Sequence, residues 1–494
     1  MSRKYSANAT LGGSQKPLHV AILGMARQGQ ALARYFLARG TYVTLSDQRS
    51  ADNLATACAE LTAFAAGQGR PPAALQFVLG GHPTSLLAGV DLLCLSGGVS
   101  PAIPVVQEAL HRGIALSNDS LLTLRYCPAP ILGITGSAGK TTTTTLVGLM
   151  LERAGFTAHV GGNIGTPLID RLDTVRPGDK VVLELSSFQL ELFDRSPAIA
   201  AVLNITPNHL DRHPSMSHYA AAKANILRSQ GPGDTTILNA DDAYTGAWLR
   251  SGRCEIPEGE GQAAVYFPLR ATLLGFSLED EVQAGAFLAG DQLIWRRPGQ
   301  PDRPICRAGE VRLHGRHNLA NILAAICLAG AAGADADAMS AVATSFGGVE
   351  HRLEIVRERA GVRWINDSIA TTPERASAAL RAFSEPVVLL AGGRDKHLPW
   401  GEFATLAHER VRHAILFGEA AGLIETALTG QNGRSTPALP ISRCHDLAEA
   451  VTLAAKIAQS GDVVLLSPGG TSFDAYVDFE ARGKHFRNLV EALP

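Results

Sequence analysis

The chain has 494 residues, enough for about three domains, because a single hydrophobic core rarely spans more than roughly 250–300 residues. Its composition, 46% hydrophobic and 18% charged, is typical of packed globular domains rather than of a disordered chain. The 44 basic and 46 acidic side chains leave a net charge of −2, which argues against a protein that wraps a polyanion. No nucleic-acid partner is therefore expected.

Three further features indicate a cytoplasmic protein. The seven cysteines are odd in number, widely spaced and without a C-x-x-C pair, so we expect reduced thiols rather than disulfides or a cysteine zinc site. No apolar run reaches the roughly 18 residues of a membrane-spanning helix, so no membrane partner is expected. Residues 1–17 are polar and rich in Ser and Gly, and they are predicted to be a flexible leader rather than a signal peptide.

Short apolar segments alternate with helix-like stretches, such as Gly29–Arg39, along most of the chain. This alternation predicts an α/β fold with mostly parallel sheets, whose buried strands are continuously apolar. The expected strands are His19–Leu23, Tyr42–Leu45, Asp91–Leu95, Ile131–Ile134, Val181–Leu185, Ala200–Ile205, Val387–Leu390, His413–Phe417 and Val463–Leu466.

Two segments are expected to separate domains. Cys127–Pro130 contains two prolines, each of which disfavours helix in the residue before it, and Gly347-Gly348 precedes a new strand expected at Leu353–Val356. We therefore predict domains at 18–128, 129–347 and 348–494. Residues 252–312 interrupt the α/β alternation with Gly, Pro and short alternating strands, and they are predicted to be a β-rich insertion in the middle domain.

A glycine-rich turn follows the strand expected at Ile131 and is followed by Lys140, Thr141 and an apolar helix to Leu151. Backbone N–H groups in such a turn bind phosphates, the lysine contacts the β- and γ-phosphates, and the next hydroxyl binds Mg²⁺. The first glycine of the turn lies three rather than five residues before Gly139, so the usual motif is incomplete. The alternative is a glycine turn with no ligand, but the flanking strand and helix favour a triphosphate site.

Further polar residues follow the next expected strands. Glu184 lies near the end of the strand expected at Val181–Leu185, where open α/β sheets bind ligands, and a carboxylate there suits Mg²⁺. Its alternative is a solvated acid at a strand end. His209 follows another strand and Lys223 lies in a helical stretch. Taken singly, these two are equally well explained as a structural histidine and a surface lysine.

The N-terminal segment has a second glycine turn. The residues Gly24 to Gly29 follow a strand and open a helix, and Asp47 ends the next strand. This arrangement is that of a Rossmann-like phosphate turn with Ala26 at the middle glycine position. The alternative interpretation is a true dinucleotide site.

Taken in order, these segments resemble the Mur ligases of peptidoglycan synthesis. The resemblance implies a Rossmann-like N-terminal domain, a central P-loop ATPase-type domain with a parallel sheet, and a C-terminal Rossmann-like α/β domain. The matching strings are TGSAGKT, GGNIGTP, ELSSFQLE, NITPNHLDRH, AAK, LNADD, GRHNLANILAA, EHRLE, WINDSIATTP, LLAGGRDK and SPGGTSFD.

The resemblance also implies an activity. It is closest to the branch that adds D-glutamate to UDP-N-acetylmuramoyl-L-alanine, with ATP and Mg²⁺, in a protein expected to be a monomer. The substrate carboxylate would attack the γ-phosphate to form an acyl phosphate, and the glutamate amine would then displace phosphate. Such a reaction needs positive charge around the transferred phosphoryl group and close placement of two anions.

Site residues follow from the same resemblance, and those of the ATP site would be Gly136, Ser137, Ala138, Gly139, Lys140, Thr141, Thr142, Asn318, Asn321, Arg352 and Asp367. Thr141 and Glu184 would hold a first Mg²⁺, and His209 and Lys223 would serve a second, with Lys223 carbamoylated by CO₂ into an oxygen ligand. The UDP substrate would contact Arg27, Gln28, Asp47 and Asn163, and the glutamate would contact Lys396, Thr371, Ser472 and Phe479. The catalytic residues would be Lys140, His209 and Lys223.

Two departures from the family pattern stand out. Ala138 replaces a common asparagine in the loop, which costs little where the backbone binds the phosphates. Ile369 stands where familiar members have a lysine, so a cation is missing beside the expected amino-acid pocket and the choice of amino acid stays open.

Other functions are compatible with parts of the pattern. Within the superfamily they are an L-alanine-adding enzyme and a folate polyglutamate synthetase, although the latter resembles only the last two domains. A nicotinamide-dependent oxidoreductase would use the turn at Gly24 and Asp47, and would leave Lys140 and Glu184 without a role. A nucleotide-sensing regulator would bind ATP without consuming it.

Overall fold

The computed structural model describes residues 18–163, 167–207, 213–260, 262–313, 315–395, 398–430 and 439–494. The predicted leader lies outside these residues. The described chain forms two compact units, one ending at Phe346 and one comprising Gly347–Pro494. The boundary predicted near Gly347-Gly348 lies at this division. No helix among the described residues is long and apolar enough to cross a membrane.

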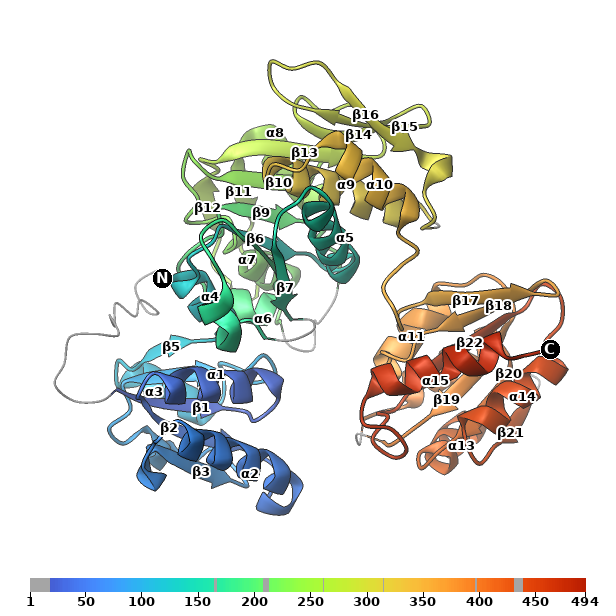
Figure 1. The fold of residues 1–494 in the computed structure, drawn as a ribbon, viewed down its shortest axis with the longest axis horizontal. Coiled ribbons are helices and arrows are strands. Elements are labelled where there is room, and N and C mark those ends of the chain that lie inside the picture. The colour runs from blue at the N-terminus through green and yellow to red at the C-terminus, as the bar shows by residue number, and fades with distance from the viewer. Residues whose placement is uncertain are drawn as a thin grey trace. The chain divides into compact units, whose positions relative to one another are not determined.

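The first unit begins with a parallel sheet in the order β3-β2-β1-β4-β5 (Figure 1). Alternate residues of β1 point to opposite faces, with Val20 and Ile22 packing in the core of α1 and α2 while Ala21 and Leu23 pack with α3. The elements are β1 (His19–Leu23), α1 (Arg27–Ala38), β2 (Tyr42–Asp47), α2 (Ala51–Gly67), β3 (Leu75–Leu79), β4 (Leu92–Leu95), α3 (Pro104–His111), β5 (Ala115–Ser117) and α4 (Asp119–Tyr126).

A larger sheet follows in the same unit, in the order β16-β15-β14-β13-β10-β9-β6-β8-β7. The strands from β7 to β14 in this order are parallel, which places their carboxyl ends at one edge. Its elements up to residue 251 are β6 (Ile131–Thr135), α5 (Lys140–Arg153), β7 (Ala158–Gly162), β8 (Lys180–Glu184), α6 (Ser187–Leu190), β9 (Ile199–Val202), α7 (Met216–Ala224), β10 (Thr235–Asn239) and α8 (Ala243–Ser251).

Residues 252–312 are rich in strands, but most of these strands are part of the central sheet. β11 (Arg253–Ile256) and β12 (Val265–Pro268) form a separate antiparallel pair. β13 (Thr272–Ser277) and β14 (Gly285–Ala289) extend the sheet in parallel, and β15 (Gln292–Arg296) and β16 (Arg303–Arg307) complete it as an antiparallel edge. The interpretation as an insertion is thus corrected, because α9 (Arg316–Ala331) packs on β10, β13 and β14 together. α10 (Ala336–Ser345) ends the unit.

The second unit has a sheet in the order β17-β18-β22-β19-β20-β21, parallel except for β17. Val463 and Leu465 of β22 pack with α11–α13, while Val464 and Leu466 pack with α14 and α15. The elements are β17 (Glu354–Arg359), β18 (Val362–Asn366), α11 (Pro373–Arg381), β19 (Val387–Gly392), α12 (Gly401–Arg410), β20 (Val411–Phe417), α13 (Ala421–Thr429), β21 (Ile441–Arg443), α14 (Leu447–Ile457), β22 (Val463–Gly469) and α15 (Phe479–Glu491).

The predicted α/β class with parallel sheets is confirmed, and each strand expected from an apolar run is present with its ends shifted by a few residues. Cys127–Pro130 connects α4 to β6, between the first sheet and the second. The two parts of this unit are joined by buried polar contacts. The Asn118 side chain caps α4 through the Leu121 N–H (2.8 Å) and donates to the backbone carbonyl of Gln189 (2.9 Å), while the Gln189 amide donates to Ser120 Oγ (2.7 Å).

We predict that Asn118→Ala lowers the free energy of unfolding by about 2–3 kcal/mol, because it removes a cap and leaves the buried Gln189 carbonyl without its donor. Asp335→Ala is the control, since the exposed Asp335 only caps α10, and it should cost about 1 kcal/mol. Urea unfolding of both variants measures the difference. Equal losses would contradict a stabilising role for the Asn118–Gln189 contact.

Candidate active site

The glycine-rich loop between β6 and α5 is braced by the segment that follows β9. The Ala138 N–H donates to Asn204 Oδ1 (2.8 Å), and the Asn204 amide donates back to the Ala138 carbonyl (3.2 Å). Ser137 Oγ donates to the Thr206 carbonyl and accepts from its N–H, both at 3.0 Å. The loop therefore keeps its shape through Asn204 and Thr206, to which the sequence analysis assigns no role.

The lysine of this loop points back over the turn. Lys140 Nζ donates to the carbonyl oxygens of Gly136 (2.8 Å) and Ser137 (3.3 Å). The ammonium group is thus held above the backbone that is expected to bind phosphate. A phosphate bound in the turn would be next to this positive charge.

Glu184 is the carboxylate of the site. It ends β8 next to β6 and its side chain is buried, with 2% of the residue exposed. One carboxylate oxygen accepts from Thr141 Oγ1 (2.8 Å) and the other accepts from Asn163 Nδ2 (3.0 Å). The structure therefore brings together Thr141 and Glu184, the predicted ligands of the first Mg²⁺, and places Asn163 on the same carboxylate.

Lys223 lies on α7 and is almost completely buried, with 1% of the residue exposed. Its Nζ donates to the Gly136 carbonyl (2.9 Å) and lies 4.5 Å from the centre of the Tyr219 ring. Burial and the neighbouring Lys140 charge hold the pKa of Lys223 well below its usual value, although Glu184 acts in the opposite direction. The alternative of a surface lysine is excluded. His209, predicted to act with Lys223, lies outside the described residues.

Two residues predicted for the ATP site, Asn318 and Asn321, border the same loop. Gly139 has a φ of +81°, and a Cβ placed on it would lie 2.1 Å from Asn321 Oδ1. The Asn321 amide donates to Asn318 Oδ1 (3.2 Å) within α9. Both asparagines therefore lie at the phosphate loop, and only a glycine fits at position 139.

The N-terminal part offers a second polar group at strand ends. The Asp47 carboxylate accepts from the Met25 N–H (2.7 Å) and from the Arg49 guanidinium (2.9 and 3.0 Å). Burial tends to raise the pKa of Asp47, but the hydrogen bonds from Arg49 and Met25 outweigh it and lower the pKa to about 2. Gln28 Oε1 accepts from the Gly97 N–H (2.8 Å), and the exposed Arg27 opens α1. No sequence motif indicates that Arg49 contacts Asp47.

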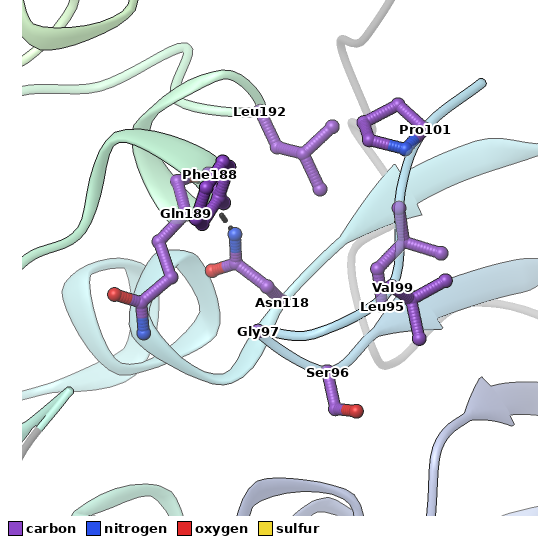
Figure 2. Close-up of a pocket in the computed structure, with 9 residues that line it drawn as sticks. All are labelled: Leu95, Ser96, Gly97, Val99, Pro101, Asn118, Phe188, Gln189 and Leu192. Atoms are coloured by element: carbon purple, nitrogen blue, oxygen red, sulfur yellow. Dashed lines mark hydrogen bonds between the residues drawn. The ribbon is translucent and has the colours of Figure 1, made fainter. Parts of the chain in front are cut away.

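A small pocket is lined by residues of both the N-terminal part and the central part of the first unit (Figure 2). The turn after β4 forms one side of it and the start of α6 forms the other. Phe188 and Gln189 fall in the matching string ELSSFQLE, but no motif assigns a role to any of the lining residues. They are Leu95, Ser96, Gly97, Val99, Pro101, Asn118, Phe188, Gln189 and Leu192.

In the second unit, Asp367 follows β18 and its carboxylate accepts from Ser467 Oγ (2.9 Å) and the Leu353 N–H (3.2 Å). Burial raises the pKa of Asp367 to about 7, against the opposing effect of these hydrogen bonds and of Arg352 and Arg375. The Leu353 backbone has a φ of +44°, so Arg352 stands in a sharp turn beside Asp367. The structure thus places these two predicted nucleotide contacts next to each other.

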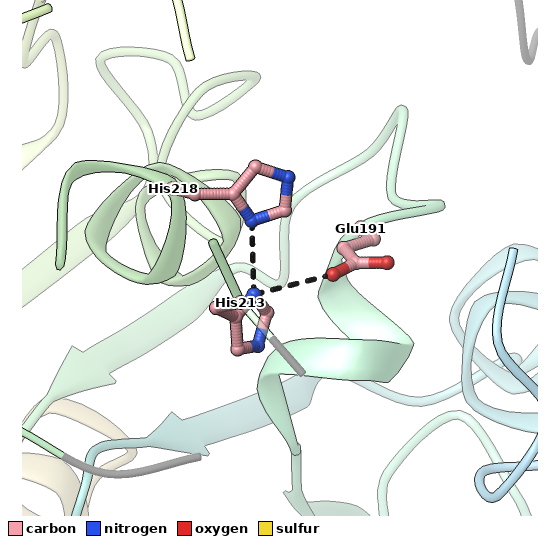
Figure 3. Close-up of side chains that lie close together, drawn as sticks. All are labelled: Glu191, His213 and His218. Carbon is pink, nitrogen blue, oxygen red and sulfur yellow. Dashed lines mark hydrogen bonds and ion pairs between the residues drawn. The ribbon is translucent and has the colours of Figure 1, made fainter. Parts of the chain in front are cut away.

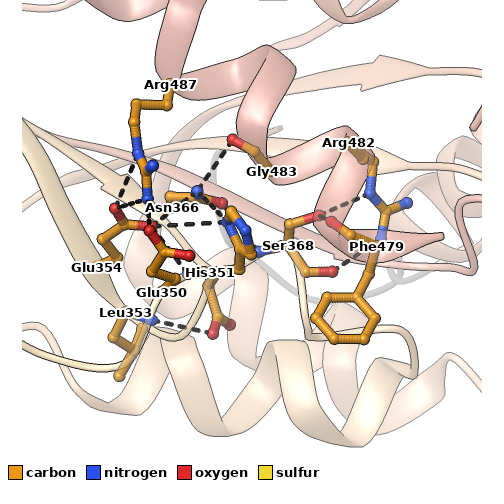
Figure 4. A network of polar contacts seen from close by, with 11 residues as sticks. Glu350, His351, Leu353, Glu354, Asn366, Ser368, Phe479, Arg482, Gly483 and Arg487 are labelled. Atoms are coloured by element: carbon orange, nitrogen blue, oxygen red, sulfur yellow. Dashed lines mark hydrogen bonds and ion pairs between the residues drawn. The ribbon is translucent and has the colours of Figure 1, made fainter. Parts of the chain in front are cut away.

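A polar network fixes that turn (Figure 4). The Asn366 amide faces His351 Nδ1 (2.9 Å) and donates to the Gly483 carbonyl and to Glu354, both at 3.1 Å. Arg487 pairs with the same Glu354 (2.5 Å). His351 is therefore a buried structural group that holds its neighbour Arg352 in place.

The remaining predicted contacts are joined by Arg482, which is fully buried. Its guanidinium donates to Ser368 Oγ (3.0 Å), the Ser368 carbonyl (2.9 Å) and the Gly470 carbonyl (3.2 Å), and burial lowers its pKa to about 10. Ser368 Oγ in turn donates to the Phe479 carbonyl (2.8 Å). Arg482 therefore ties together the three segments that carry Thr371, Ser472 and Phe479. Lys396 lies outside the described residues.

Three family models match consecutive parts of this chain. The model described as "Mur ligase MurD-like, N-terminal domain" matches residues 18–118, "Mur ligase middle domain" matches 134–258, and "Mur ligase, glutamate ligase domain" matches 351–470. Together they cover most of the chain, in the order expected from the sequence.

Relatives of high identity span the whole length. The UDP-N-acetylmuramoylalanine–D-glutamate ligase of Symbiobacterium thermophilum is 45% identical over 483 residues, covering 98% of this chain and 100% of that protein. The protein of the same name from Pelotomaculum thermopropionicum is 38% identical over 475 residues, with coverages of 96% and 97%.

Solved structures share the fold at low identity. MurF from Acinetobacter baumannii has a TM-score of 0.51 and 16% identity, covering 97% of this chain and 94% of that one. The murein peptide ligase from Psychrobacter arcticus 273-4 has a TM-score of 0.50 and 16% identity, with coverages of 97% and 99%. The predicted three-domain α/β arrangement is confirmed.

We predict that Gly139→Ala weakens the binding of an ATP analogue at least about tenfold, because the added Cβ displaces Asn321 and strains the left-handed backbone. Gly155→Ala is the matched control, since Gly155 has a φ of +87° and nothing within 4 Å of an added Cβ. Isothermal titration calorimetry gives both affinities. Unchanged binding by Gly139→Ala would show that this turn does not contact the nucleotide.

Proposed function

Because this chain belongs to the Mur ligase family, we propose that it catalyses the ATP-dependent addition of D-glutamate to UDP-N-acetylmuramoyl-L-alanine, in the synthesis of a peptidoglycan precursor. One observation carries the proposal: the phosphate loop, the Glu184 carboxylate and the buried Lys223 meet at one edge of the central sheet. The name of relatives that are 45% and 38% identical over their whole length supports the choice of reaction within the family.

The chemistry has two bond exchanges. The L-alanyl carboxylate attacks the γ-phosphorus of ATP, the bond to the β-phosphate oxygen breaks, and ADP leaves an acyl phosphate behind. The amine of D-glutamate attacks the acyl carbon, loses a proton, and phosphate leaves as the amide forms. The loop N–H groups and Lys140 hold the phosphates during the first exchange, which lowers the repulsion between the two anions.

We propose that Thr141 and Glu184 hold the first Mg²⁺, and that His209 and Lys223 serve the second. The donor set fits a hard cation, because a hydroxyl and a buried carboxylate already lie 2.8 Å apart. Bound Mg²⁺ supplies positive charge beside the phosphates. The contact of Asn163 with Glu184 supports a role for Asn163 in placing the acceptor carboxylate near this site.

Lys223 suits carbamoylation by CO₂. Its amine is buried beside Gly136 and Lys140, where an uncharged amine is favoured, and only the uncharged amine attacks CO₂. The attack forms an N–C bond and releases one proton, which converts the side chain into an anionic oxygen ligand. This change of charge explains a lysine among predicted metal ligands.

The remaining predicted residues are proposed to bind the UDP end of one substrate and the amino acid that is added. The UDP end lies with Arg27, Gln28 and Asp47, and the amino-acid end with Lys396, Thr371, Ser472 and Phe479. Residues 136–142, Asn318 and Asn321 are the proposed ATP contacts of the first unit, and Arg352 and Asp367 are those of the second. The protein is proposed to act as a cytoplasmic monomer.

Arg375 is proposed to supply the positive charge that is missing because Ile369 stands where familiar members have a lysine. Its guanidinium lies 3.4 Å from the Ile369 carbonyl, in the first turn of α11, and its charge acts on Asp367. An exposed arginine at this place can pair with a glutamate carboxylate in bidentate fashion.

Phosphate release with ATP, UDP-N-acetylmuramoyl-L-alanine and a panel of amino acids tests the function. D-glutamate should give the largest turnover, and ¹⁸O from the alanyl carboxylate should appear in the released phosphate. Turnover with L-alanine and UDP-N-acetylmuramate would assign the chain to another member of the family. If no amino acid of the panel raises turnover above background, or if the released phosphate lacks the label, ligation through an acyl phosphate is refuted.

We predict that Lys223→Ala lowers kcat by at least about 10³-fold, because a group that acts on the transferred phosphoryl is lost. Formate or acetate should restore part of the activity by replacing the missing anion. Lys456→Ala, at an exposed position on α14, is the control and should keep full activity with no effect of carboxylates. Full activity of Lys223→Ala would rule out the carbamate.

We predict that Arg375→Met raises the KM for D-glutamate at least about tenfold while kcat changes less, because a binding contact is removed. Arg381→Met, at the exposed end of the same helix, should leave the KM unchanged. The double variant Ile369→Lys with Arg375→Met should recover part of the affinity. Steady-state kinetics measures all three, and an unchanged KM for Arg375→Met would contradict the assignment.

A further inference from the structure

Three side chains of types that bind metals, and that the proposed function does not use, lie close together (Figure 3). Glu191 follows α6, His213 precedes α7, and His218 lies in the first turn of α7. One ligand atom of each lies within 4.8 Å of the other two. We propose that Glu191, His213 and His218 bind a zinc ion, at a site separate from the proposed Mg²⁺ sites.

The distances suit one small ion. His213 Nδ1 lies 2.9 Å from His218 Nδ1 and 3.5 Å from Glu191 Oε1. Two ligands at about 2.0–2.1 Å from a tetrahedral zinc are roughly 3.3–3.4 Å apart, a value between these two distances. Two imidazoles whose Nδ1 atoms face each other share one hydrogen between them, and a cation can replace that hydrogen after a small separation of the two rings.

The surroundings orient His213 for this role. Its side chain is fully buried, its Nε2 is 2.9 Å from Ser187 Oγ, and its ring stacks on Phe188 with an interplanar angle of 2°. A ligating histidine usually has such a partner on its other nitrogen, because the partner fixes the tautomer and the ring. In the bound form, Nε2–H donates to Ser187 Oγ and Nδ1 presents its lone pair to the metal.

The donor set also selects the metal. Two imidazole nitrogens and one carboxylate favour Zn²⁺ over Mg²⁺, which prefers oxygen ligands such as those of Thr141 and Glu184. Three protein ligands leave a fourth position open to water. The proposed zinc and Mg²⁺ sites therefore differ in chemistry, although their residues are close in the chain. Ser187, the partner of His213, follows Glu184 by three residues, and His218 precedes Lys223 by five.

The test measures metal binding by the full chain without substrates, so its result is independent of ligase activity. The protein is dialysed against ZnCl₂ with excess MgCl₂ present, and bound zinc is counted by elemental analysis. One Zn²⁺ per chain is expected, with a low-symmetry four-coordinate absorption spectrum when CoCl₂ replaces ZnCl₂. His218→Asn should weaken zinc binding at least about 100-fold, since even loss of an outer-shell partner costs 10–100-fold.

Two further variants make the result decisive. Glu191→Gln keeps the size of the side chain and should also weaken binding, whereas His111→Asn, at an exposed position on α3, should bind like the wild type. Thermal unfolding of each variant shows that it is folded, and if His218→Asn does not fold, Glu191→Gln carries the test. Absence of bound zinc in the wild type, or equal zinc binding by the folded cluster variants and His111→Asn, would overturn the proposal.

Discussion

The hydrogen bond between Thr141 and the buried carboxylate of Glu184 is the contact on which the rest of the site depends. It exists because β6 and β8 pair in parallel, which brings the phosphate loop after one strand to the carboxylate that ends the other. A buried carboxylate is costly without partners, and here Thr141 and Asn163 satisfy it. A cation bound between Thr141 and Glu184 would replace their hydrogen bond, and both ligands are already in position for it.

Much of the fold follows from the apolar runs, because a strand buried on both faces must be apolar throughout. The same reasoning fails for residues 252–312: their pattern predicts an insertion, whereas β13 and β14 continue the central sheet. Strand pairing between distant segments leaves no local pattern. The turns and glycines of this region are typical of an antiparallel edge, and β15 and β16 are indeed one.

The site was predictable where a motif places chemistry at a strand end, as for Lys140, Thr141 and Glu184. The burial of Lys223 was not predictable, because a single lysine on an alanine-rich helix has the pattern of a surface charge. Asn204 and Arg482 were missed for a different reason. Asn204 contacts Ala138, 66 residues away, and Arg482 contacts Ser368, 114 residues away, so only the folded structure shows that they hold the loops of the site.

The division between Phe346 and Gly347 has a mechanical consequence. Within the described residues, each sheet is built from strands of its own unit, and β17 starts the second sheet only after the Gly347-Gly348 pair. A rotation about this glycine hinge leaves every ladder of backbone hydrogen bonds intact. Glycine adopts a wider range of backbone torsion angles than other residues, so the backbone at this junction does not itself oppose such a rotation.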